Sequence, residues 1–302
     1  TVFMPGVSYR QKPLRPVMMR TYGGEVHESP SDLTEVGRAA RIKDPQRIGS
    51  LNIANGEAIE IARSVAGARF AVGSGENHVL LHQTVIGQEA VRQMEEIGDY
   101  PNVVTACVGA GSNFAGIAFP FIRNSRKSGR DVRLIAAEPV ACPKLTRGLY
   151  AYDMSDASSA TPYVRMMTLG RDVSVPGIHA GGLRYHGTSP LLSAMYRDGL
   201  FEARSFAQRK VFETAVLFAR TTGMIIAPES AHALAAAVQA VQESPAPICV
   251  LANVSGHGLL DLSSYDAYLN GEMDDGIPDE DMIVRSLSML RERNEQVQVE
   301  VA

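Results

Sequence analysis

The sequence predicts an α/β fold in which a twisted parallel or mixed sheet is flanked by helices. Three apolar runs support this prediction, at residues 103–108, 132–137 and 248–254. Segments with helical spacing separate these runs, so the chain alternates between strand and helix. Because a crossover helix joins strands that run in the same direction, we expect the sheet to be largely parallel.

The first residues predict a second, smaller unit. Residues 1–4 read as a strand, residues 10–22 have the spacing of an amphipathic helix, and residues 25–27 read as another short strand. The glycine pair after Tyr22 is typical of a helix end. We therefore assign residues 1–48 to the remnant of a smaller, incomplete N-terminal α/β domain.

Residues 49–270 are expected to form the larger domain. Helical spacing and turn residues predict its helices, at residues 54–66, 83–97, 114–122, 190–195, 205–221 and 230–243. Residues 141–190 read as loop-rich. Acidic residues crowd together after Asn270, so residues 271–302 are interpreted as an acidic tail with a terminal helix.

Composition excludes several classes of protein. The chain has 302 residues and a formal net charge of −4, which disfavours nucleic acid as a partner. No stretch approaches the roughly 18 to 20 apolar residues of a membrane span, and no signal segment opens the chain, so we expect a cytoplasmic protein. Three cysteines without a C-x-x-C spacing indicate neither a disulfide framework nor a metal site.

A loop of small residues follows the run 103–108 and precedes a helix. It consists of Gly109, Ala110, Gly111, Ser112 and Asn113. Such a loop presents successive backbone N–H groups at the positive end of a helix dipole, an arrangement that binds phosphate. An ordinary βα turn without a ligand is the alternative.

A dinucleotide fits this loop poorly. The third glycine of the dinucleotide fingerprint falls on Phe114, and the acidic Glu138 lies 27 residues beyond Gly111 rather than about 20. The hydroxyl and amide of the loop suit a single terminal phosphate monoester better than a bridging pyrophosphate.

Three polar segments are further candidates for a site. Glu229 begins a helix and is either a first-turn carboxylate favoured by the helix dipole or a site residue. Ser255 follows the run 248–254, at the edge of a parallel sheet where ligands bind, although a plain turn has the same pattern. The segment 179–187 contains two histidines, Arg184 and a tyrosine, and either closes over a substrate or is a solvated loop.

Together these segments resemble a known enzyme family, the β chain of tryptophan synthase, and most closely its second, often stand-alone class. Five motifs in the same order carry the resemblance: Leu81 to Gly87, Gly109 to Asn113, His179 to Gly187, Ala227 to His232 and Ser255 to Gly258. The resemblance covers residues 1 to about 268. It implies a pyridoxal-phosphate enzyme of fold type II, with two α/β domains around the cofactor.

The resemblance also implies roles for single residues. The loop from Gly109 to Asn113 would hold the cofactor phosphate, and Ser255 would hydrogen-bond the pyridine nitrogen. Glu229 would lie beside the cofactor ring, so that it both contacts the cofactor and takes part in catalysis. Arg184 replaces an aspartate of the commoner class of β chain and would stabilise an anionic leaving group, so that O-phosphoserine is accepted as well as serine.

Two motifs of the family are missing from this sequence. One carries the Schiff-base lysine, and the other binds the substrate carboxylate. The sequence contains five lysines, and none of them replaces the missing one convincingly: Lys12, Lys43, Lys127, Lys144 and Lys210. We therefore expect a truncated chain or half of a split enzyme, inactive by itself.

The complete enzyme would condense indole with L-serine or O-phosphoserine to give L-tryptophan. The expected partners are a second copy of the chain or a missing N-terminal half, together with a tryptophan synthase α chain. Two alternatives stay open. One is a serine or threonine deaminase, which the segment 179–187 argues against, and the other is a non-catalytic partner subunit.

Overall fold

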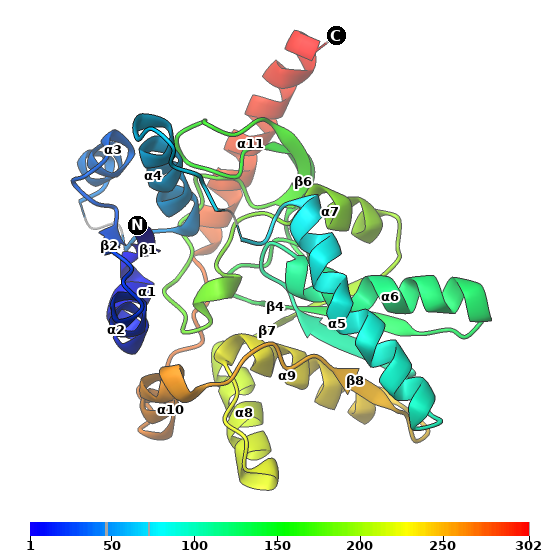
Figure 1. The fold of residues 1–302 in the computed structure, drawn as a ribbon. Coiled ribbons are helices and arrows are strands. Elements are labelled where there is room, and N and C mark those ends of the chain that lie inside the picture. The colour runs from blue at the N-terminus through cyan, green and yellow to red at the C-terminus, as the bar shows by residue number, and fades with distance from the viewer. Residues whose placement is uncertain (46–47, 72, 302) are drawn as a thin grey trace.

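The computed structural model describes residues 1–45, 48–71 and 73–301, with side chains up to residue 296. A four-stranded sheet lies at the centre of the larger part of the molecule (Figure 1). Its strands are all parallel and follow the order β7 (Glu202–Phe206), β4 (Arg133–Pro139), β3 (Val103–Cys107) and β8 (Val250–Ala252). The predicted α/β class with a parallel sheet is therefore confirmed.

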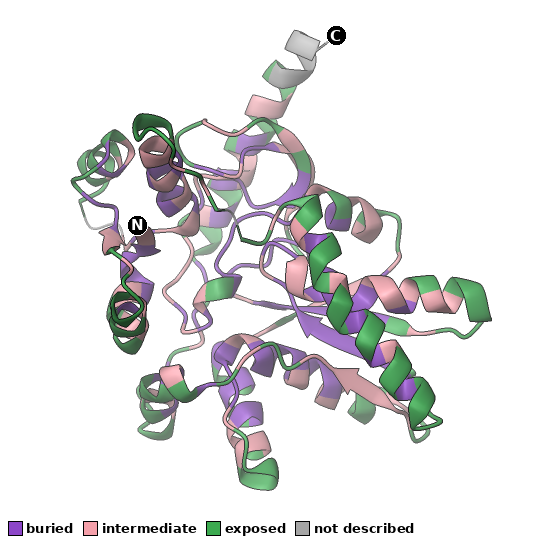
Figure 2. Cartoon of the chain, viewed as in Figure 1, coloured by how far each residue is buried: buried purple, intermediate pink, exposed green. Residues whose placement is uncertain are grey.

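Helices cover both faces of this sheet. On one face, α5 (Asn77–Glu96) and α6 (Ser112–Ser128) pack on a cluster that includes Val104 and Ala106 of β3. On the other face, α9 (Pro228–Glu243) packs on Val103. Buried residues lie on the two central strands, β3 and β4, whereas β8 is drawn as intermediate in Figure 2. Because side chains alternate between the two faces of a strand and both faces are covered, β3 is buried throughout and β4 is buried from Leu134 onward, mostly through apolar side chains.

The N-terminal residues form the expected β-α-β unit. Strand β1 (Val2–Pro5) pairs in parallel with β2 (Val26–Ser29). The single helix predicted over residues 10–22 is wrong, because the chain forms α1 (Gly6–Gln11) and α2 (Leu14–Thr21) instead. Pro13 explains the break: it has no N–H to donate, and its ring disfavours a helical conformation at Lys12.

The helices predicted from residue 54 onward are present with shifted ends, whereas residues 35–43 and 262–269 form helices that were not predicted. Helix α4 (Leu51–Ser64) and α5 both begin earlier than predicted. Ranges for the others are α3 (Glu35–Lys43), α7 (Pro190–Arg197), α8 (Gln208–Thr222) and α10 (Leu262–Leu269). No helix within the described ranges is long and apolar enough to cross a membrane.

The prediction of a loop-rich segment over residues 141–190 is wrong in part. It contains an antiparallel pair, β5 (Leu149–Asp153) and β6 (Val164–Thr168), and the short 3-10 helix η1 (Gly181–Leu183). Strand β7 also overlaps the start of the helix predicted over 205–221. It is an edge strand with charged, half-buried residues, so it lacks the apolar run that marks β3.

The C-terminal residues pack against the rest of the chain. Helix α11 (Glu280–Val301) buries Ile283 and Leu290, each about 1 % exposed. Its Asn294 side chain bonds both the N–H and the carbonyl of Tyr152 in β5. In Figure 1 the far end of α11 extends beyond the body. The division at residues 48 and 270 stays a prediction.

Two adjacent leucines of α5 test this packing. Leu80 is fully buried, whereas Leu81 is 60 % exposed. We expect Leu80→Ala to lower the free energy of unfolding by about 2–5 kcal/mol, because it leaves a cavity. The control Leu81→Ala makes the same chemical change and is expected to stay within about 0.5 kcal/mol. Urea unfolding measures both, and equal losses would contradict the placement of α5.

Candidate functional site

The small-residue loop crosses the C-terminal end of β3 and leads directly into α6. None of the peptide N–H groups of residues 109–114 has a hydrogen-bond acceptor in the described parts of the chain. The first N–H groups of any helix lack a partner within the helix. Here the unpaired series begins before the helix, so six successive donors are available to an anion.

Two glycines allow the loop to take this path. A Cβ atom on Gly109 would lie 2.5 Å from the carbonyl oxygen of Gly182, which is too close for any side chain. Gly111 has a φ of +126°, a conformation that residues with side chains rarely adopt. The loop is also fixed from outside, because Ser189 donates its N–H to the Ala110 carbonyl at 2.7 Å.

The Asn113 side chain ties the loop to the sheet. Its amide nitrogen donates to the Cys107 carbonyl at 2.9 Å, and its amide oxygen accepts from Asn253 at 2.8 Å. Asn253 follows β8 directly. The peptide N–H of Asn113 is therefore free for a ligand, whereas its side chain already has partners.

Ser255 lies at the same edge of the sheet, after β8. The residue is exposed, and its hydroxyl lies 2.9 Å from the hydroxyl of Ser230 and 3.8 Å from the Cys107 thiol. Ser230 is fully buried and accepts the N–H groups of Ser255 and Gly256 at 3.0 and 3.1 Å. Sequence reasoning missed Ser230, although its place beside Glu229 in the first turn of α9 was a usable signal.

Glu229 is held close to the loop. Its Oε1 accepts the Gly182 N–H at 3.0 Å, and its Oε2 is buried without a partner among the described residues. Burial raises the pKa of Glu229, but the Lys12 ammonium and the Gly182 N–H lower it, and the net pKa is below the ordinary value. Glu229 is therefore a carboxylate near neutral pH.

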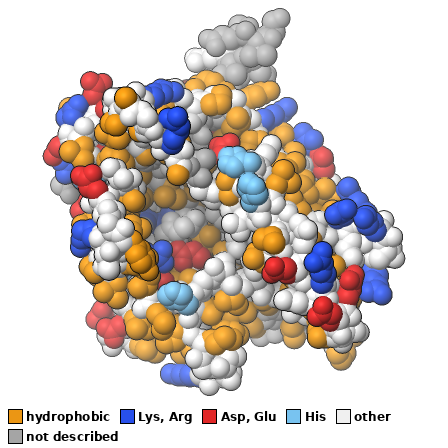
Figure 3. Space-filling view, in the orientation of Figure 1, with side chains coloured by type: hydrophobic (Ala, Val, Ile, Leu, Met, Phe, Trp, Pro, Cys, Tyr) orange, Lys and Arg blue, Asp and Glu red, His pale blue; other side chains and the backbone are white. Residues whose placement is uncertain are grey.

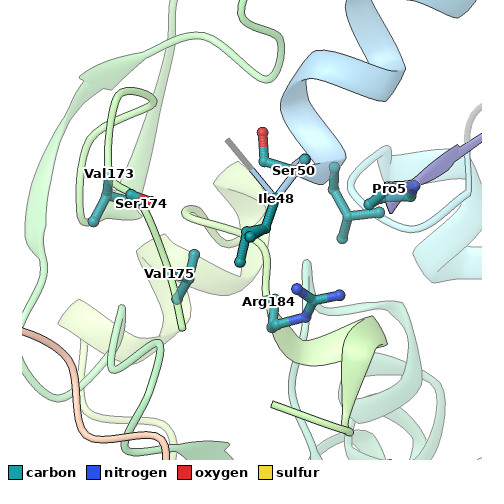
Figure 4. A pocket seen from close by; sticks show the side chains of 9 residues that line it. Pro5, Ile48, Ser50, Val173, Ser174, Val175 and Arg184 are labelled. Atoms are coloured by element: carbon teal, nitrogen blue, oxygen red, sulfur yellow. The ribbon is translucent and has the colours of Figure 1, made fainter. Parts of the chain in front are cut away.

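Arg184 lies between the N-terminal unit and the larger part. Its guanidinium donates to the Ser8 hydroxyl, and its Nε is buried without a partner in the described chain. Burial lowers the pKa of Arg184 to about 10. Figure 4 shows the guanidinium bordering a narrow pocket together with Ile48 and Val175.

The segment 179–187 is packed rather than solvated, so the solvated alternative is wrong. Leu183, Tyr185 and His186 are buried, and His186 Nε2 lies 3.0 Å from the Met154 carbonyl. The glycines at 181 and 182 bring η1 against Ser8, Gly109 and Glu229. The segment thus joins the phosphate loop, the carboxylate and the N-terminal unit.

A cavity of about 200 Å³ opens beside the phosphate loop. Ala110, Gly182 and Tyr185 line one side, and α4 and residues 73–76 line the other. In Figure 3 the face is hollowed between the N-terminal unit and the rest, and acidic and basic side chains are visible in the hollow. The cavity and the free N–H groups thus lie at one end of the sheet.

Two of the five lysines are buried, which the sequence did not indicate. Lys144 donates to the Val108 carbonyl at 2.9 Å and lies 3.7 Å from Glu138, directly beneath the phosphate loop. Lys12 does not lie within a helix, as the predicted helix over residues 10–22 would require; it follows α1 and lies 2.8 Å from Asp261 and 3.5 Å from Glu229. None of the five lysines lines the 200 Å³ cavity.

The sheet, the loop and the helix that follows it define an α/β protein that binds a phosphate-bearing ligand. The family model described as pyridoxal-phosphate dependent enzyme matches residues 1–256. The chain therefore belongs to the family of pyridoxal-phosphate dependent enzymes.

Several curated proteins are close in sequence. The chain is 49 % identical to tryptophan synthase beta chain 2 of Aeropyrum pernix over 283 residues, which is 92 % of this chain and 63 % of that protein. It is 50 % identical to the beta chain 2 of Aquifex aeolicus over 91 % of this chain and 64 % of that one. The chain thus spans slightly less than two thirds of these relatives.

A solved structure has a similar fold at low sequence identity. A variant of O-ureido-L-serine synthase bound to O-ureido-L-serine matches with a TM-score of 0.58 and 16 % identity. The match covers 92 % of this chain and 69 % of that chain. This likeness supports the fold type that the sequence predicts.

The residues at the sheet edge fit the phosphate of pyridoxal phosphate. Six free N–H groups and two positions that tolerate no Cβ form a cradle for one phosphate group. The hydroxyl of the exposed residue Ser255 at the same edge is a neutral partner for a pyridine nitrogen. Glu138, the acidic residue near the end of β4, is not available to a ribose, because it is buried and accepts the N–H groups of Leu145 and Thr146.

Gly109→Ala tests this cradle. The added Cβ displaces the loop from Gly182, so we expect the dissociation constant for pyridoxal phosphate to rise at least about tenfold, or about 1.4 kcal/mol. Equilibrium dialysis measures it. The control is Gly129→Ala at the other end of α6, where φ is +71° and no atom lies within 4 Å of the added Cβ. It is expected to cost about 1–2 kcal/mol of stability without affecting affinity. Unchanged binding by the Gly109 variant would exclude this loop.

Proposed function

We propose that this chain carries the cofactor-phosphate part of an enzyme like the β chain of tryptophan synthase. This lyase joins indole to L-serine or O-phosphoserine and gives L-tryptophan. The observation that supports this most strongly is the coincidence of the free N–H groups of residues 109–114, Ser255 and Glu229 at one sheet edge, in a chain half identical to such β chains.

Each of these residues has a task in the proposal. The N–H groups of residues 109–113 bind the cofactor phosphate, and Ser255, fixed by Ser230, hydrogen-bonds the pyridine nitrogen. Bound pyridoxal phosphate supplies an electron sink for the amino-acid substrate. A neutral hydroxyl leaves the ring nitrogen unprotonated, which favours β-replacement. Glu229 places its carboxylate beside the ring.

The cavity is suited to an apolar, planar second substrate. Leu51, Ile59 and Phe70 form an apolar wall opposite Ala110 and Tyr185. Small-molecule sites are mostly apolar with a few fixed polar groups, and indole needs this kind of surface. The proposal therefore places indole in the 200 Å³ cavity beside the loop.

The proposal includes partners that the chain does not itself contain. They are a second copy of the chain, a tryptophan synthase α chain, and a segment that supplies the lysine and the substrate-carboxylate loop. The absence of any lysine from the cavity lining supports the need for such a segment. The proposed location is the cytoplasm.

Tryptophan formation tests the proposal. We expect no product from the chain with pyridoxal phosphate, indole and L-serine, and product once the unmatched part of the Aquifex aeolicus relative is supplied as a separate polypeptide. Liquid chromatography with mass detection measures it. Keto-acid release without tryptophan would favour the deaminase, and no turnover in either case would favour a non-catalytic subunit. Borohydride reduction with peptide mapping is the control, because a stoichiometric cofactor adduct on one of the five lysines would overturn the need for a supplied lysine.

Arg184→Ala tests the proposed preference for a phosphorylated substrate in the reconstituted enzyme. The guanidinium is the cation proposed to stabilise a phosphate leaving group, and such charge-assisted bonds contribute about 1.5–3 kcal/mol. We expect kcat/KM for O-phosphoserine to fall at least about tenfold more than kcat/KM for serine. An equal fall for both substrates would show that Arg184 acts only by holding Ser8.

A further inference from the structure

A group of four charged side chains, of which Lys12 and Asp261 are buried, joins the N-terminal unit to the larger part. Lys12 lies 2.8 Å from Asp261 and 3.5 Å from Glu229, and Arg15 lies 3.2 Å from both oxygens of Asp261. Lys12 and Asp261 are 2 % and 0 % exposed. Asp261 belongs to the short 3-10 helix η2 (Leu259–Asp261). Two residues of the N-terminal unit thus meet two carboxylates of the larger part.

The charges in this group balance, but the two carboxylates do not share the cations equally. Asp261 contacts both Lys12 and Arg15, whereas Lys12 is the only cation within 4 Å of Glu229 among the described side chains. The other bond to Glu229 is the neutral Gly182 N–H. If Lys12 is removed, Asp261 keeps a cation in contact with it, whereas Glu229 keeps none within 4 Å among the described side chains. A buried carboxylate without a neighbouring cation takes up a proton more readily. Removal of Lys12 is therefore expected to raise the pKa of Glu229.

Other ionisable groups near Glu229 do not take the place of Lys12. The Arg184 guanidinium is turned to Ser8, with which it bonds. Burial lowers the pKa of His232 to about 4, so this ring is neutral near pH 7. Burial raises the pKa of Cys107 to about 12, so this group is a neutral thiol. Arg15, the remaining cation of the group, also lowers the pKa of Glu229, but less than Lys12 does, and its hydrogen bonds go to Asp261.

Lys12 reaches Glu229 only because the N-terminal unit is docked. Lys12 follows α1, and α1 is attached to the larger part on both sides: Gln11 donates to the Gly177 carbonyl at 2.5 Å and accepts from Ser263 at 3.2 Å. If the unit moves away, Lys12 moves with it. Glu229 stays with α9.

We propose that Lys12 is a positioning residue that keeps Glu229 ionised, and that it does so because the docked N-terminal unit places its ammonium 3.5 Å from the carboxylate. The inference deepens the proposed function, in which Glu229 lies beside the cofactor ring. The charge beside the ring then depends on the position of Lys12.

Titration of the Glu229 carboxyl carbon by ¹³C NMR tests the proposal in the full chain without cofactor or substrate. The Glu229→Gln variant identifies the signal. We expect Lys12→Met to move the midpoint to higher pH and Lys12→Arg to restore it towards the wild-type value. Arg15→Met is the matched control, because it removes one charge from the same group but leaves the cation next to Glu229, and its midpoint is expected to move less.

A reversible disulfide that holds the N-terminal unit in place separates the effect of the Lys12 charge from the effect of docking. A Cβ on Gly181 would lie 3.9 Å from the Cβ of Ser8, close to the mean of about 3.8 Å in disulfides. Oxidised Ser8→Cys/Gly181→Cys therefore holds the unit in place. In this locked form we expect the midpoint to stay low with Lys12 and to stay high with Lys12→Met.

Three results would overturn the proposal: an unchanged midpoint in Lys12→Met, an equal displacement in Arg15→Met, or a return to the wild-type midpoint in the locked Lys12→Met variant. Circular dichroism confirms folding of each variant, and Lys12→Gln replaces Lys12→Met if the latter unfolds. Because the titration needs no turnover, its failure is distinct from a failure to form tryptophan.

Discussion

The constraint on which this site depends is that the N–H groups of residues 109–114 have no partner among the described residues and yet are fixed in place. Unpaired backbone donors cost free energy when they are buried, so a folded chain normally gives them partners. Here the surroundings supply rigidity without supplying acceptors. Asn113 ties the loop to β3 and to Asn253, Ser189 holds the Ala110 carbonyl, and Lys144 holds the Val108 carbonyl from below. The loop is thus ready for an anion before the anion arrives, which reduces the entropy lost on binding.

Burying charged side chains also costs free energy in this structure. Lys144 and Glu138 are both fully buried, and removing a single charge from water costs several kcal/mol unless partners compensate. Each is compensated mainly by the backbone: Lys144 by the Val108 carbonyl, and Glu138 by two N–H groups of the turn that follows β4. This pair fixes the turn at residues 144–146 against the base of the loop. In the same way, the ion pair of Lys12 and Asp261 holds the N-terminal unit against the larger part of the chain, with Arg15 as an additional partner of Asp261.

The sequence is sufficient for those features whose cause is local. Strands β3 and β4 are covered on both faces, so their apolar runs identify them, and the small residues after β3 mark the loop. Strand β7 was missed because an edge strand with Glu202 and Arg204 has no such run, although its Arg204 is fixed by Glu243 of α9. The contact of Lys12 with Glu229 and that of Arg184 with Ser8 each join residues 176 or more positions apart. The hydrophobic periodicity within one segment cannot predict such contacts.

The break in the helix at Pro13 determines which charged groups Lys12 contacts. A continuous helix over residues 10–22 would place Lys12 in a regular turn, with its side chain directed by the helix axis. Pro13 prevents this, and Lys12 takes a φ of −126° and a ψ of 62° between two short helices. From this position its ammonium passes between η2 and α9 and meets both carboxylates. Because Pro13 ends the helix, Lys12 can contact Glu229 and Asp261, and the charge at the site depends on this break. The sequence alone does not show this effect, because it does not place Glu229 and Asp261 next to Lys12.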